Sequence, residues 1–362
     1  MSWYVIDAVD RAVERTRKCL IEPFDLWKWI KLSIIALFLG GGGGGNFNGG
    51  GNSYGGSDPD LSQIPAGLTE LMDSIHNFIS SYSLMSIIIG VILALVLFAL
   101  VMRIVGSIME FVFVGSLVSN DVQIRKYFKM YFGKGISLFV LRFLLGLVVL
   151  LVFILLGLAS LSMAGISISD LSDPSSIDEG KLLMLFASAM IFGIFILLVV
   201  SVIMGIIESF INLAIPVSMY SECSIFSGLS RVLAQFRNEW KQVVIYWLGR
   251  AVLIIAVGIA VAILGLIIGV IILILMGLAD LALYYILSSL VADTTVWMVL
   301  IPVIVIEFFL LIFAMVFVGM PAKVFMKYHM LTFLQMWYPI ELPVFDKPSG
   351  MYGMVSESTE DW

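Results

Sequence analysis

The chain has 362 residues, of which 61% are hydrophobic and only 13% are charged. A soluble domain is about 45–50% apolar and about 25% charged, so these proportions exclude an ordinary water-soluble fold and favour a protein embedded in a bilayer. The formal net charge is -6, but basic and acidic residues occupy different stretches, so the net value says little about partners.

Six stretches are apolar and long enough to be membrane-spanning helices. A helix rises 1.5 Å per residue, so about 20 apolar residues cross a hydrocarbon core of about 30 Å. The predicted spans are residues 27–45, 84–118, 136–163, 182–219, 244–278 and 296–320. The first span is the weakest, because it needs the glycines from Gly40 onward to reach across the membrane. Together, residues 1–343 are predicted to form the membrane domain, and residues 344–362 a flexible cytoplasmic tail.

Three amphipathic helices are predicted, over residues 4–20, 121–132 and 225–243, each near the start of an odd-numbered span. In the third, apolar residues recur at spacings of three and four from Phe226 to Val243. The second is shorter and is predicted to end near Gly133. Such helices lie in the membrane interface, or they pack against the protein's own helix ends; the sequence leaves both readings open.

Interfacial helices would turn their basic residues toward anionic lipid headgroups on the cytoplasmic side. The residues predicted to contact headgroups are Arg11, Arg15, Lys18, Arg125, Lys126, Lys129, Arg231, Arg237 and Lys241. Membrane lipids are therefore the predicted partners, with a membrane protein as a further possible partner.

The distribution of basic residues predicts the topology. Of the 20 Lys and Arg residues, 19 fall on one side of the predicted spans and Lys181 falls on the other. Basic loops are retained in the cytoplasm, so both termini are predicted to be cytoplasmic in a multi-pass cell-membrane protein. The opposite loops are acidic and include Asp280 and Asp293.

A glutamate recurs in each even-numbered span. Glu110, Glu208 and Glu307 are 98 and 99 residues apart. Each is followed by a phenylalanine one or two positions later. This self-similarity indicates three related helical hairpins. The predicted fold is therefore an all-α polytopic membrane bundle of about six transmembrane helices in three hairpin-like repeats, with cytoplasmic interfacial helices.

The same three glutamates are predicted to be the only carboxylates inside the apolar spans. A charge in the bilayer is costly, so intramembrane carboxylates either form an ion pathway or pair with a partner that fixes helix packing. The predicted partners are Lys31, Arg103, Arg142, Arg250 and Asn212. We weigh structural pairing above an ion pathway, because each hairpin would then carry its own clasp.

Motifs for catalysis are missing from the sequence. The glycine run at 40–45 lacks the Lys and Ser or Thr of a phosphate-binding loop. His76 and His329 are predicted to lie on opposite sides of the membrane, so they form no metal pair. We predict no catalytic residue, metal, cofactor or nucleic-acid partner, and hence no enzyme.

Two parts of the chain resemble known families. The motif WYVIDAVD at residues 3–10, followed by PFDLWKW at 23–29 and the glycine run, resembles an uncharacterised family of archaeal multi-pass membrane proteins. The stretch from FSGL at 226–229 to FRNEW at 236–240 is similar to a motif in six-span proteins that include the membrane domain accompanying some glycerophosphodiester phosphodiesterases. The first resemblance implies an archaeal cell membrane. The phosphodiesterase activity is not carried over, because no such catalytic domain is present.

The leading hypothesis for function is non-enzymatic organisation or support of the membrane or of a membrane complex. The alternative is a transporter or channel that uses the intramembrane glutamates.

Overall fold

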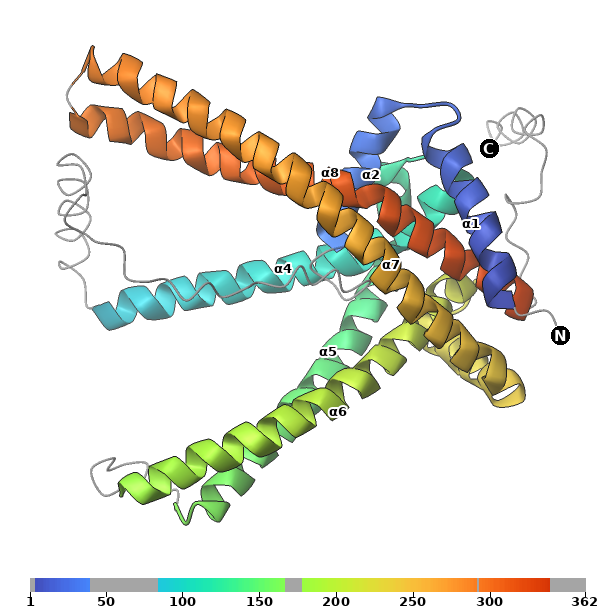
Figure 1. Ribbon diagram of the computed structural model, residues 1–362. Helices are drawn as coiled ribbons and strands as arrows, with labels where there is room; N and C mark the ends of the chain where they lie inside the picture. Colours follow the sequence, from blue (N-terminus) through green and yellow to red (C-terminus); the bar gives the residue numbers. More distant parts are fainter. Residues whose placement is uncertain (1–3, 40–83, 167–177, 292, 339–362) are drawn as a thin grey trace. The chain divides into compact units, whose positions relative to one another are not determined.

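The computed structural model describes residues 4–39, 84–166, 178–291 and 293–338, and these residues form seven helices and no strand (Figure 1). The helices are α1 (Tyr4–Leu20), α2 (Leu26–Leu39), α4 (Leu84–Ser119), α5 (Ile124–Met163), α6 (Glu179–Tyr220), α7 (Ile225–Ser288) and α8 (Asp293–Trp337). The predicted all-α class is confirmed for these residues. The glycine run, His76 and the tail lie outside them.

The chain divides into two compact units. The first unit consists of residues 1–130 and 239–362, and the second of residues 131–238. A kink in α7 at Glu239, where φ is -131° and ψ is 44°, coincides with the second boundary. Below, "the first segment of α7" means residues 225–238, which belong to the second unit.

In the first unit, α1 packs along the C-terminal half of α8 (Figure 1). The buried residues of α1 recur at helical spacing, so they lie on one face of the helix. They are Val5, Ala8, Ala12, Cys19 and Leu20. The protein itself therefore covers this face of α1, while Ile6 and Val13 remain exposed.

Helix α2 packs against α4 and α8, and polar contacts link these three helices. The Lys323 ammonium group on α8 donates a hydrogen bond of 2.9 Å to the carbonyl oxygen of Ala36 on α2. The Tyr328 hydroxyl group, also on α8, donates one of 3.0 Å to the carbonyl oxygen of Leu117 on α4. These contacts satisfy backbone carbonyls near helix ends and hold α8 at the centre of the unit.

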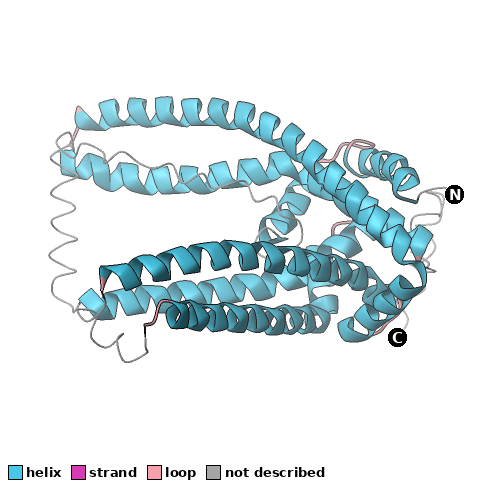
Figure 2. Cartoon of the chain, turned by 60° about the horizontal axis from the view of Figure 1, so that its bottom comes forward, coloured by secondary structure: helices cyan, strands magenta, loops and turns pink. Residues whose placement is uncertain are grey.

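The part of α7 after the kink runs beside α8 in the opposite direction (Figures 1 and 2). Gly269 leaves room for the end of the Met315 side chain, since a Cβ at Gly269 would lie 2.3 Å from the Met315 methyl carbon. Near the turn between the helices, the rings of Tyr284 and Trp297 are 6.0 Å apart. Side chains thus join α7 and α8 both along their length and near the turn between them.

In the second unit, α5 and α6 lie side by side, and the first segment of α7 packs on the end of α6 (Figure 2). A Cβ at Gly228 would lie 3.1 Å from the Ala214 carbonyl oxygen and 3.2 Å from the Ser218 Cβ. The rings of Phe210 and Phe236 meet edge to face at 5.1 Å. Glycine at position 228 is what lets the two helices approach this closely.

Five of the described helices are long and apolar enough to span a membrane. They are Ile88–Ser119, Ile124–Met163, Leu183–Tyr220, Ile225–Ser288 and Thr295–Trp337. These ranges include five of the six predicted spans. Helix α2 has 14 residues and is about 21 Å long, which is too short to cross a bilayer alone. The end of the predicted span 27–45 lies outside the described residues.

Several helix boundaries differ from the prediction. Helix α5 runs through Gly133 and Gly135 without a break, because each glycine costs a helix only about 1 kcal/mol. The first segment of α7 is likewise joined to the following span, with only a kink between them. Helix α7 continues to Ser288, past the predicted end at 278, since residues 279–288 are mostly Ala, Leu and other residues that a helix accepts.

Candidate functional site: charged residues of the long helices

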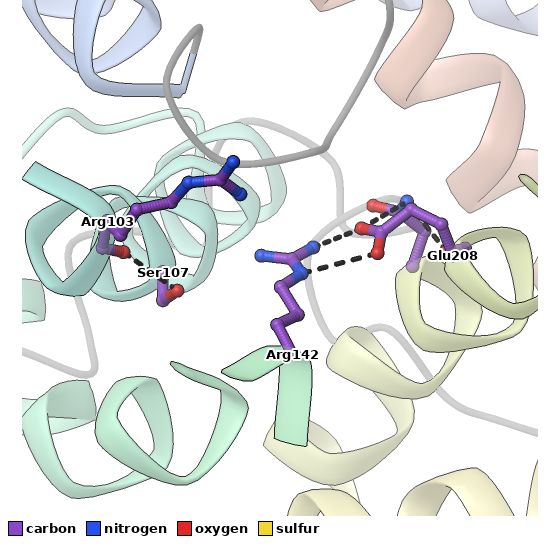
Figure 3. Close-up of polar contacts among 5 residues, drawn as sticks. Arg103, Ser107, Arg142 and Glu208 are labelled. Carbon is purple, nitrogen blue, oxygen red and sulfur yellow. Dashed lines mark hydrogen bonds and ion pairs between the residues drawn. The ribbon is translucent and has the colours of Figure 1, made fainter. Parts of the chain in front are cut away.

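An ion pair joins the two long helices of the second unit (Figure 3). The Arg142 guanidinium group on α5 donates hydrogen bonds from Nη2 to Glu208 Oε1 and from Nε to Glu208 Oε2, the second of 3.3 Å. The side chains of Arg142 and Glu208 are 11% and 25% exposed. A planar guanidinium that meets both carboxylate oxygens is the strongest ion-pair geometry, and it cancels two charges that would otherwise be costly here.

Asn212 completes this cluster one turn further along α6. Its side-chain amide donates hydrogen bonds to the Glu208 carbonyl oxygen at 2.9 Å and to Glu208 Oε1 at 3.4 Å. Residues four apart on a helix face the same way, which explains this arrangement. The structure thus brings together Arg142, Glu208 and Asn212, three of the residues named as candidates, in a clasp between two helices.

Glu110 lies in the buried half of α4 and is 1% exposed. Its neighbours Met109 and Phe111 are buried as well. One turn before it, the Ser107 hydroxyl group donates a hydrogen bond of 3.0 Å to the carbonyl oxygen of Arg103 (Figure 3). Arg103 itself is exposed. Glu110 is thus enclosed by protein, whereas Arg103 lies on the surface of the same helix.

Glu307 on α8 interacts with the carboxyl group of Asp280 on α7. The sequence prediction placed Asp280 in the loop that follows residue 278, whereas the structure carries it within α7, which continues to Ser288. The missed signal is the run of helix-forming residues on both sides of Asp280. Two carboxylate charges in contact disfavour each other, which distinguishes Glu307 from Glu208 and its arginine partner.

Two predicted partners of the glutamates contact aromatic side chains. The guanidinium group of Arg250 donates a hydrogen bond of 2.5 Å to the Tyr246 hydroxyl oxygen and lies 5.8 Å from the centre of that ring. The Lys31 ammonium group lies 5.8 Å from the centre of the Trp27 ring. The three glutamates are therefore not equivalent: Glu208 has the predicted arginine, and Glu307 has a second carboxyl group.

Of the basic residues predicted to contact headgroups, Arg15 is held by another helix, Lys18 pairs with a neighbouring glutamate, and the rest are exposed. Arg15 donates hydrogen bonds to Thr332 Oγ1 at 2.8 Å and to Gln335 Oε1 at 3.2 Å, so α8 holds it. Lys18 forms an exposed ion pair with Glu14, and the hydrogen bond from Lys18 keeps the pKa of Glu14 below its ordinary value. The others are exposed: Arg11, Arg125, Lys126, Lys129, Arg231, Arg237 and Lys241.

The first segment of α7 has apolar residues on two faces, and only one of these faces is buried. One face, with Ile225, Gly228 and Val232, is buried against the second unit. A second apolar stripe points outward, with Phe226 49% and Leu233 40% exposed. This segment therefore keeps an apolar surface that no described residue of the second unit covers.

Among the described residues, no group of three or more His, Cys, Asp or Glu side chains could hold a metal ion. The long apolar helices, clasped by charged groups, define the class: an all-helical protein with membrane-spanning helices. The chain belongs to the Family of unknown function (DUF7544), whose family model matches residues 3–340. The comparisons with curated proteins and with solved structures found no match.

Proposed function

We propose that the protein is a non-enzymatic component of the cell membrane that organises or supports the bilayer or a membrane complex. In this proposal both termini and the basic connections face the cytoplasm. The archaeal membrane, implied by the resemblance of residues 3–10 and 23–29, belongs to the same proposal, as do the three related hairpins.

The observation that carries the proposal is the outward apolar stripe of the first segment of α7. Phe226 and Leu233 are half-exposed, and the exposed Arg237 lies on the same segment. Full burial of such apolar side chains is worth about 1.5–3 kcal/mol each, so half of that gain is still open to these two residues. A basic helix with an apolar stripe gains it by resting in the headgroup layer.

The rest of the chain supports a binding role better than a catalytic one. The best-formed polar cluster, Arg142 with Glu208 and Asn212, has its hydrogen bonds directed inward between two helices. Such a clasp stabilises packing and presents no group to a substrate. We therefore infer that the protein acts through its surfaces.

Native mass spectrometry of the full chain, released from its own membrane in polymer-bounded lipid discs, tests this proposal. We expect a protein or a lipid species to remain on the chain in a fixed ratio. A bare chain, or one with lipids in proportion to the bulk membrane, would argue against the proposal.

A second candidate function is transport, and the contact of Asp280 with Glu307 favours it. Paired carboxyl groups between membrane helices are typical of proton and cation pathways. The test is ion flux into liposomes that contain the full chain, with Glu307→Gln and Asp280→Asn compared with the exposed control Asp10→Asn. Flux that both span variants abolish and the control retains would support transport; no flux in the wild type would remove it.

A further inference from the structure

The first segment of α7 carries a shallow groove with a volume of about 350 Å³. The residues that line it are Phe226, Leu229, Ser230, Leu233, Ala234 and Arg237. Their spacing of three and four places all of them along one face of the helix. Apolar side chains form most of the groove, and the single charge, that of Arg237, lies at its C-terminal end.

The groove is separate from the face that packs on α6. Successive residues turn by about 100°, so the groove lies about 130° around the helix from Gly228, Val232 and their buried neighbours. Gly228 fixes this orientation, because its backbone contact with Ala214 leaves no room for the segment to roll toward α6. The groove thus faces away from its own unit.

The guanidinium group of Arg237 is available to a ligand. Arg237 is exposed, and no hydrogen bond or ion pair within the described part of the chain engages it. A guanidinium group binds phosphate oxygens through two parallel hydrogen bonds. An apolar groove that ends in such a group is complementary to a molecule with a hydrocarbon chain and a phosphate.

We propose that this groove binds one anionic phospholipid, with an acyl chain along Phe226 and Leu233 and the phosphate on Arg237. The inference rests on the proposed function, since it names the lipid that the membrane-facing segment would recognise. The charge of Arg237 selects an anionic headgroup over a zwitterionic one. The apolar run that follows the segment in α7 supports a lipid as the occupant, because it enters the layer where acyl chains are present.

The test is photolabelling of the full chain in lipid discs, using phosphatidylglycerol with a photoreactive acyl chain. We expect label on the peptide that contains residues 226–237, and about fivefold less label in Arg237→Gln, as the loss of one charge near an anionic headgroup predicts. The matched control is Arg231→Gln, which removes the same charge from the same segment on a face outside the groove. It should keep the wild-type level.

Three results would overturn the inference: label on this peptide that Arg237→Gln leaves unchanged, equal losses in Arg237→Gln and Arg231→Gln, or equal labelling by a phosphatidylcholine probe. A photoreactive residue at position 233 that crosslinks only to protein would assign the groove to another chain and overturn it too. Leu233→Asn tests the apolar part and should also lower the label.

These outcomes are independent of those for the proposed function. If the groove is photolabelled but native mass spectrometry finds no stoichiometric protein or lipid on the chain, the lipid site is supported and the organising role is not. An unlabelled groove in a chain that does retain a partner protein would do the reverse.

Discussion

The guanidinium group of Arg142 on α5 holds both carboxylate oxygens of Glu208 on α6. Both side chains lie mostly inside the hairpin, at 11% and 25% exposure. The pair therefore joins α5 to α6 within their apolar stretches. The pair stabilises packing because each charge neutralises the other, whereas either charge alone would be costly in its apolar helix.

Removing one partner of this pair should be more damaging than removing both. Arg142→Met leaves the Glu208 charge without its counterion, and we expect a loss of about 3 kcal/mol in the free energy of unfolding. The double variant Arg142→Met, Glu208→Met should recover most of this loss, since an apolar pair of similar volume is often neutral. Unfolding in detergent by increasing denaturant measures both. Equal stability of the single variant and the wild type would contradict the clasp.

Gly228 should tolerate no side chain. Gly228→Ala places a Cβ 3.1 Å from the Ala214 carbonyl oxygen, which is backbone and cannot move aside. We expect the first segment of α7 to separate from α6 at a cost of about 1–3 kcal/mol, seen as faster proteolysis between residues 221 and 238. Gly146→Ala is the control, because a Cβ there meets nothing within 4 Å. If both variants resist protease like the wild type, the close approach is not required.

Arg15 should hold α1 on α8. Its hydrogen bonds to Thr332 and Gln335 are between a charged and a neutral group, and such bonds contribute about 1.5–3 kcal/mol. Arg15→Ala should therefore raise amide hydrogen exchange throughout α1 by about tenfold or more. Arg11→Ala, an exposed residue of the same helix with the same charge, should leave exchange unchanged. Similar exchange in the two variants would show that apolar contacts alone dock α1.

The topology can be tested with one native cysteine. Cys223 lies in the connection between α6 and α7 and is partly exposed, whereas Cys19 is buried. A membrane-impermeant maleimide should label Cys223 in inverted vesicles and not in intact cells, because we predict this connection to be cytoplasmic. Ser289→Cys, in the turn between α7 and α8, should react on the opposite side in a Cys223→Ser background. Labelling of both positions from one side would contradict the topology.

The sequence was sufficient for properties that depend on local composition. Apolar run length predicted the five long helices, and the cost of a charge in an apolar span indicated that each glutamate needs a partner, without saying which basic residue pairs with Glu208. The sequence was insufficient where a segment far along the chain determines which side chains are buried. The apolar face of α1 could be covered by lipid or by protein, and only packing against α8, more than 300 residues away, distinguishes the two. Asp280 was placed in a loop because the predicted span ended at residue 278, whereas α7 continues to Ser288.

Helix α8 is continuous through Pro302 and Pro321 from Asp293 to Trp337. Its first half exposes apolar side chains, while its second half is enclosed by α1 and α2. The exposed half must match the local thickness of the hydrocarbon layer, and mismatch costs a fraction of a kcal/mol per Å. A thinner or thicker bilayer that tilts or shifts α8 would displace α1 and α2 with it. A change in bilayer thickness would thus be transmitted along one continuous helix to the two helices that pack on it.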